Sequence, residues 1–132
     1  SKFLIIAIGT WFLFMLAAII NAGIRNGVYK PILGDLRAHQ LSTFIFIFII
    51  FILTYFVLKY SQLELTTQQS FIIGTIWLIL TVCFEFLAGH YLFGNSWNNL
   101  ISDYNILKGR IWSFVLVTLF FAPYLTNRLF IK

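Results

Sequence analysis

Four long apolar runs separated by polar connections dominate the pattern of this chain. The runs cover about residues 3–22, 41–58, 71–88 and 111–125, and Glu85 is the one charged residue within them. About 20 residues in a helix cross the roughly 30 Å hydrocarbon core of a bilayer. The pattern therefore predicts an all-α integral membrane protein, a four-helix bundle forming a single transmembrane domain over residues 1–132.

The polar connections differ in length and divide the chain into two helical hairpins. The first, over residues 21–40, and the third, over residues 89–110, are long, whereas the middle one near residues 59–69 is shorter. Four crossings place the first and third connections on the same side of the membrane. Both carry apolar residues at helical spacing, which predicts an interfacial helix in each. Both halves then have the order spanning helix, interfacial helix, spanning helix. This order is typical either of a degenerate parallel repeat or simply of two similar hairpins.

Small residues and prolines within the runs predict where helices approach or bend. The first helix is expected to allow close packing through its small residues Gly9, Ala17, Ala18, Ala22 and Gly23, and the third through Gly74. Pro123 is expected to kink or end the fourth helix, because proline cannot donate the helical hydrogen bond.

Composition agrees with a membrane location and excludes several classes of function. Hydrophobic residues make up 61% of the 132 residues and charged residues 10%, against about 25% charged in typical soluble domains. The net charge of +5 comes from Lys and Arg beside the apolar runs, where they anchor to lipid headgroups. We therefore expect membrane lipids as partners and no nucleic acid, with a homo-oligomer or a larger membrane partner left open. Cys83 is the single cysteine, which excludes an internal disulfide.

Glu85 is the first candidate for a functional residue. It lies about one turn inside the third run, where an ionised carboxylate needs a cation or a proton. Arg110, at the start of the fourth run, is the expected partner, with Arg25 as the second choice. Two interpretations stay open: an ion pair that fixes helix register, or a polar cavity open to one side of the membrane.

Two histidines and an aspartate fall on the same side as Glu85. Gly89 is expected to end the third helix and let His90 turn back toward Glu85. Together with His39 and Asp103, His90 raises the question of a metal site. Because neither HExxH nor paired ExxH spacing is present, we predict no metal and no cofactor.

The first connection is basic. Arg25, Lys30 and Arg37 suit binding of a phosphate or carboxylate, and they equally suit a collar that anchors the protein to anionic lipid. No GxSxG motif and no nucleophile placed with His and Asp is present, so the sequence favours a protein that is not an enzyme.

The last third of the chain resembles a family of small bacterial membrane proteins classed as ABC-transporter type IV permeases. The resemblance covers residues 85–123 and rests on an acidic residue late in one helix, a segment with Trp, Asp and Tyr, and a Gly-Arg start to the next helix. The matching positions here are Glu85, Trp97, Asp103, Tyr104, Gly109 and Arg110. The resemblance implies a shared polar constellation and a transport-type component.

These patterns lead to one main expectation about function. A one-sided basic pocket is expected to bind an anionic or zwitterionic small molecule or a lipid headgroup, in a transport-type or ligand-binding protein of the bacterial inner membrane. The candidate ligand-binding residues are Arg25, Arg37, His39, Glu85, His90, Asp103, Tyr104 and Arg110. A structural subunit of a larger complex and an enzyme acting on lipid or isoprenoid substrates are the alternatives. Orientation stays open, because Lys and Arg are nearly balanced between the two sides.

Overall fold

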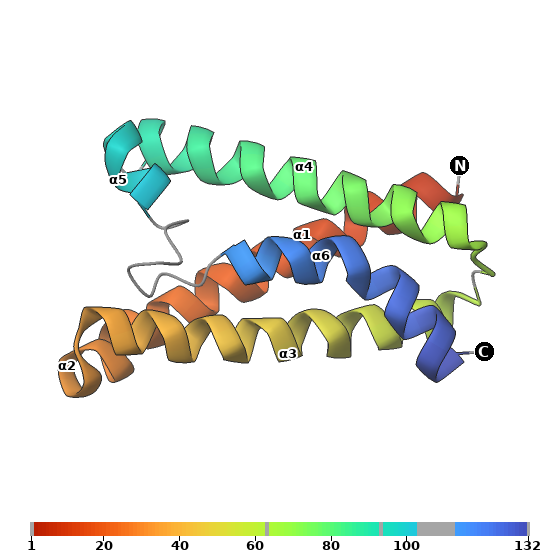
Figure 1. The fold of residues 1–132 in the computed structure, drawn as a ribbon, viewed down its shortest axis with the longest axis horizontal. Helices are drawn as coiled ribbons and strands as arrows, with labels where there is room; N and C mark the ends of the chain where they lie inside the picture. The colour runs from red at the N-terminus through yellow and green to blue at the C-terminus, as the bar shows by residue number, and fades with distance from the viewer. Residues whose placement is uncertain (1, 63, 93, 103–112, 132) are drawn as a thin grey trace.

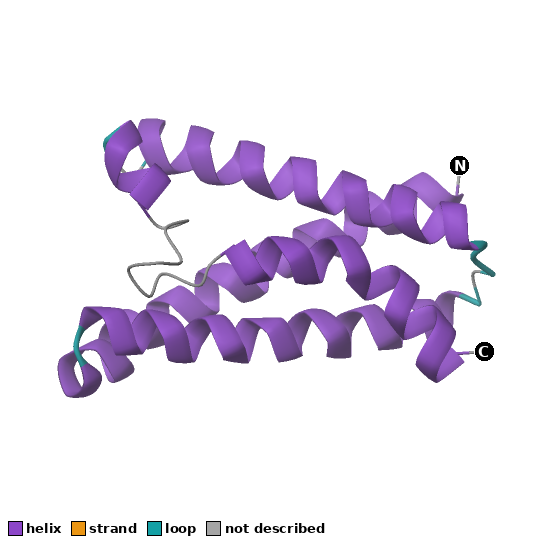
Figure 2. Cartoon of the chain, in the orientation of Figure 1, coloured by secondary structure: helices purple, strands orange, loops and turns teal. Residues whose placement is uncertain are grey.

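The computed structural model describes residues 2–62, 64–92, 94–102 and 113–131, and nearly all of this part of the chain is helical (Figure 2). The elements are α1 (Lys2–Ile24), the π-helical turn η1 (Arg25–Tyr29), α2 (Lys30–Leu33), α3 (Asp35–Ser61), α4 (Thr67–Tyr91), α5 (Trp97–Ser102), α6 (Ser113–Thr126) and the π-helical turn η3 (Asn127–Ile131). Within the described residues, four helical segments are long and apolar enough to cross a membrane: Lys2–Leu33, Asp35–Ser61, Thr67–Tyr91 and Ser113–Ile131. The predicted all-α four-helix bundle is confirmed, and the chain is an integral membrane protein.

The four long helices form a ring in which each packs on two others. α1 packs on α3 and α4, and α6 packs on the same two helices. α1 and α4 run in one direction and α3 and α6 in the other (Figure 1). Both chain termini and the α3–α4 connection lie at one end of the bundle, and α2 and α5 lie at the other (Figure 1). The first and third connections therefore share an end. The third contains a separate short helix, α5, whereas α2 continues α1, so the prediction of a separate interfacial helix in the first connection is wrong.

The first connection is shorter than its sequence suggests. Helical backbone angles continue from α1 through η1 into α2, so Lys2–Leu33 is one helical segment of 32 residues. At helical rise this is about 48 Å, well beyond the hydrocarbon thickness of about 30 Å. Pro31 lies in the first turn of α2, directly after the π-helical turn η1. The chain reverses at Gly34, whose φ of +85° only glycine adopts readily.

Two tryptophan side chains join α1 to α4 in the core. The indole N–H of Trp77 donates to the carbonyl oxygen of Ala7 at 2.8 Å, and that of Trp11 donates to the hydroxyl of Thr81 at 3.0 Å. Both pairs are 70 residues apart, as a parallel register of the two helices requires. A buried indole N–H needs such an acceptor, because the bilayer core offers no water.

The glycine predictions are partly confirmed. A Cβ added at Gly74 would meet the backbone of Phe120, so this glycine permits the close packing of α4 on α6. The same atom at Gly9 or Gly23 would meet nothing within 4 Å, so the prediction of close packing at these two positions is wrong.

Pro123 does not end the fourth helix, since α6 continues to Thr126. The ribbon of α6 changes direction along this C-terminal part (Figure 1).

The end of the bundle that carries the termini is fixed by polar contacts of the middle connection. Thr66 caps α4: its hydroxyl accepts from the backbone N–H of Gln69, while the Gln69 side chain accepts from the N–H of Thr66, both at 3.1 Å. The buried side chain of Asn127 donates to the carbonyl of Leu65 at 3.2 Å. These bonds cap α4 and tie the connection before it to η3.

Candidate binding cavity

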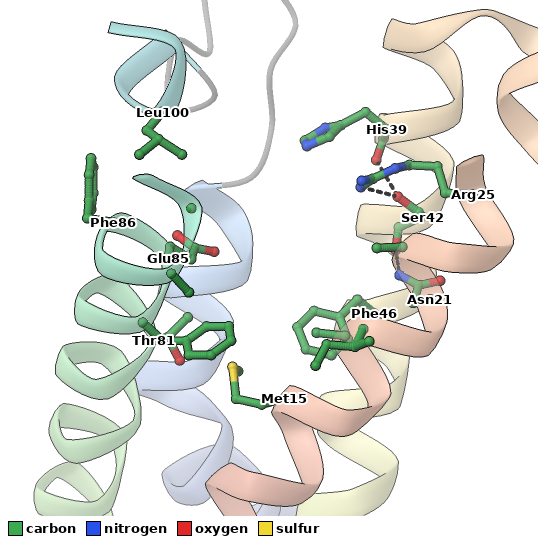
Figure 3. A pocket seen from close by; sticks show the side chains of 16 residues that line it. Met15, Asn21, Arg25, His39, Ser42, Phe46, Thr81, Glu85, Phe86 and Leu100 are labelled. Carbon is green, nitrogen blue, oxygen red and sulfur yellow. Dashed lines mark hydrogen bonds between the residues drawn. The ribbon is translucent and has the colours of Figure 1, made fainter. Parts of the chain in front are cut away.

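A cavity of about 420 Å³ lies toward the end of the bundle that carries α2 and α5. Its lining comes from α1, η1, α3 and α4, with Leu100 contributed by α5 (Figure 3). The volume falls within the range of about 300–1,000 Å³ that is typical of pockets for small ligands. Polar and charged side chains line one part of the cavity and apolar side chains the other, so its walls are described separately.

The first wall is basic and centres on Ser42 of α3. The side-chain amide of Asn21 donates to the Ser42 carbonyl at 2.8 Å, and the Ser42 hydroxyl donates to the carbonyl of His39 at 3.0 Å. The guanidinium of Arg25 reaches the same hydroxyl at 3.5 Å, the long end of the hydrogen-bond range. We call Asn21, Arg25, His39 and Ser42 the basic wall. Its hydrogen bonds tie the end of α1 to the start of α3. The side chains of Arg25 and His39 point toward the cavity (Figure 3).

The opposite wall belongs to α4 and carries Glu85. Thr81 and Glu85 lie one turn apart on α4, and both side chains line the cavity (Figure 3). Glu85 is half-buried, and its carboxylate points toward the side where Arg25 and His39 lie. Gly89 also lines the cavity. Its lack of a side chain lets Leu100 of α5 approach α4, because a Cβ there would collide with the Leu100 side chain. We call Thr81, Glu85 and Gly89 the acidic wall.

The deeper part of the cavity is apolar. Met15 of α1 and Phe46 of α3 line it (Figure 3). Met15 and Arg25 are ten residues apart in one helical segment, so the lining changes from apolar to cationic over about 15 Å. This polarity follows the membrane, with the charged residues at the interfacial end and the apolar ones toward the bilayer centre.

The structure brings together three of the residues singled out from the sequence. Arg25, His39 and Glu85 line one cavity, with Glu85 opposite the other two. Arg25 was the second choice of partner for Glu85, and the cavity separates their walls. The first choice, Arg110, lies outside the described residues, as do Asp103 and Tyr104. The cavity interpretation of Glu85 therefore has a geometric basis in the described part of the chain.

Arg37 and His90 lie away from the cavity. Arg37 is exposed on the first turn of α3 and does not line it. His90 remains helical because α4 continues to Tyr91, so the prediction that Gly89 ends the helix is wrong. The His90 ring stacks on Trp97 with centroids 3.9 Å apart, and its Nδ1 lies 2.8 Å from the carbonyl oxygen of Asn95. Since a carbonyl only accepts, Nδ1 carries the proton, and His90 fixes α5 against α4.

Sequence reasoning did not select Asn21, Ser42 or Thr81. Each is a polar residue within or beside an apolar run, and Ser42 and Thr81 are only 1% exposed. Their type gave a usable signal, because a buried hydroxyl in a spanning helix has to bond to something. Many such hydroxyls bond back to their own helix, as Thr54 does to Ile50. The sequence alone does not distinguish a hydroxyl that bonds within its own helix from one that bonds to another helix, as Thr81 does to Trp11.

No group of three or more His, Cys, Asp or Glu side chains able to hold a metal occurs among the described residues. The cavity places a guanidinium and an imidazole on one wall and a carboxylate on the opposite wall (Figure 3). Comparison with known proteins adds no name to this site: no family model, no curated protein and no solved structure matches the chain.

Proposed function

We propose that this protein binds an anionic or zwitterionic ligand in the cavity between the basic and acidic walls, as a ligand-binding or transport-type component of the membrane. The observation that carries the proposal is the position of Arg25 and Glu85 on opposite walls of one cavity. Charged side chains within or next to spanning helices are expensive and usually mark a functional site. A structural role in helix register alone would favour a close-packed contact over a cavity of about 420 Å³.

The two walls suit a ligand with an anionic group. Arg25 offers several donors in a planar fork, which matches phosphate or carboxylate. His39 adds a nitrogen that can donate or accept, and Ser42 is fixed by its bonds to the neighbouring helix turn. On the other side, Glu85 accepts hydrogen bonds and suits an ammonium group. The resemblance of residues 85–123 to bacterial permeases is compatible with transport and would place the protein in a bacterial inner membrane.

The test is native mass spectrometry of the full chain, purified in mild detergent and exposed to a bacterial polar lipid extract. We expect the wild type to retain a stoichiometric anionic or zwitterionic molecule. Arg25→Gln and Glu85→Gln should lose it, while thermal unfolding shows that both variants are folded. Arg37→Gln is the matched control, since Arg37 is an arginine at the same end of the bundle but outside the cavity. Retention of the molecule by Arg25→Gln and Glu85→Gln would reject the proposal.

A further inference from the structure

The cavity begins where α1 and α4 stop touching. The two helices are joined at Ala7 with Trp77 and at Trp11 with Thr81. Toward the end that carries α2 and α5, their ribbons diverge (Figure 1), and residues of both helices line the cavity between them. The space between two membrane-spanning helices is thus occupied by a cavity at the depth where a packed core is expected.

The cavity also opens toward the membrane. Ile19 of α1 lines it and is nevertheless 58% exposed, on a helix long enough to span the bilayer. A residue that is both cavity wall and outer surface marks the mouth of the cavity. Because this mouth lies on the side of a spanning helix, the medium in front of it is lipid.

A second hollow continues the cavity along the outside of α4. This outer groove has a volume of about 450 Å³, and Trp11, Cys83 and Leu87 are among the side chains that line it. Phe84 and Ala88 line both the outer groove and the cavity. One turn of α4 is therefore shared between a charged cavity and an apolar groove that faces the hydrocarbon.

We infer that the ligand of the cavity is a zwitterionic membrane phospholipid that enters sideways between α1 and α4. Its phosphate contacts Arg25 and His39, its ammonium group contacts Glu85, and an acyl chain lies over Phe84 in the outer groove. A water-soluble ligand would have no use for the apolar depth of the cavity or for an opening toward lipid. This inference rests on the proposed function, since it specifies the ligand and the route for the same cavity.

The experiment uses Cys83, the single cysteine of the chain, as a reporter in the outer groove. The full chain carries a bimane label on Cys83 in an uncharged detergent and is titrated with dibrominated phosphatidylethanolamine or dibrominated diacylglycerol. Bromine quenches the label only at close range. We expect saturable quenching at about tenfold lower concentration for the phospholipid, the effect of one or two charge-assisted hydrogen bonds. Arg25→Gln and Glu85→Gln should remove this difference, and Arg37→Gln should keep it.

Three outcomes would overturn the inference, and they separate it from the proposed function. Equal quenching by both lipids, with native mass spectra showing that water-soluble glycerophosphoethanolamine binds the wild type but not Arg25→Gln, would reject a lipid ligand and leave the cavity a binding site. Stronger quenching by dibrominated phosphatidylglycerol would reject a zwitterionic headgroup. No binding of any of these probes, in spectra of the unlabelled chain as well, would reject the phospholipid inference, and the absence of any retained molecule from the wild-type spectra would reject the proposed function as well.

Discussion

Trp11 of α1 and Thr81 of α4 form the last hydrogen bond between these two helices before the cavity opens. The indole N–H donates to the threonine hydroxyl at 3.0 Å, and both residues are buried. Thr81 also lines the cavity, so one residue closes the packed part of the α1–α4 contact and begins the acidic wall. This hydrogen bond therefore holds α1 and α4 together at the inner end of the cavity.

Replacing Trp11 by Phe should lower stability by about 1 kcal/mol, since it removes the donor and keeps most of the aromatic surface. The measurement is thermal or denaturant unfolding in detergent. Thr81→Val removes the acceptor, and the Trp11→Phe/Thr81→Val double-mutant cycle should give a coupling of similar size. Thr75→Val is the control, because Thr75 is an exposed threonine of α4 whose hydroxyl donates to the carbonyl of Phe71 in its own helix. Additive effects in the cycle would contradict the bond.

Gly74→Ala should destabilise the bundle strongly, because the new methyl group would collide with the backbone of Phe120 and push α6 away from α4. We expect a loss of at least about 2 kcal/mol, or failure to purify as a monodisperse species. Gly9→Ala makes the same chemical change on a spanning helix where the methyl group meets nothing. Its unfolding temperature should equal or exceed that of the wild type, and equal losses in the two variants would refute the packing argument.

Gly34→Ala and Gly27→Ala should have effects of opposite sign. Gly34 has φ +85° and ψ 169°, a region open almost only to glycine, so alanine should cost about 1–3 kcal/mol. Gly27 lies in the helical turn η1 with open space around it, where alanine should add up to about 1 kcal/mol of stability. Unfolding of both variants under identical conditions checks the signs. A neutral Gly34→Ala would mean that the α2–α3 turn relaxes without cost.

Ala22→Leu should reduce ligand binding without reducing stability. Ala22 lines the cavity, and a larger apolar side chain fills empty volume that a ligand would need. Ligand retention in native mass spectra should fall, while the unfolding temperature stays the same or rises. Gly23→Leu is the control, since Gly23 is the next residue, is exposed and lies outside the lining of the cavity. Unchanged retention in Ala22→Leu would place the ligand elsewhere.

The sequence by itself determined the membrane class, the four spanning segments and the end at which charges gather. These properties are one-dimensional: the length of an apolar run against bilayer thickness, and the side to which each connection returns. The same logic places Arg25, His39 and Glu85 at one end of the bundle from the sequence alone.

Only the tertiary structure decided which residues at that end face one another. Arg37 and His90 reach the same end as Arg25 and Glu85, yet they point elsewhere, because the rotation of each helix about its axis is set by packing. The parallel pairing of α1 with α4 through Trp11 and Thr81 joins residues 70 positions apart, which no local pattern encodes. The cavity exists because these two helices touch over one half of their length and separate over the other, and that is a property of the packed bundle.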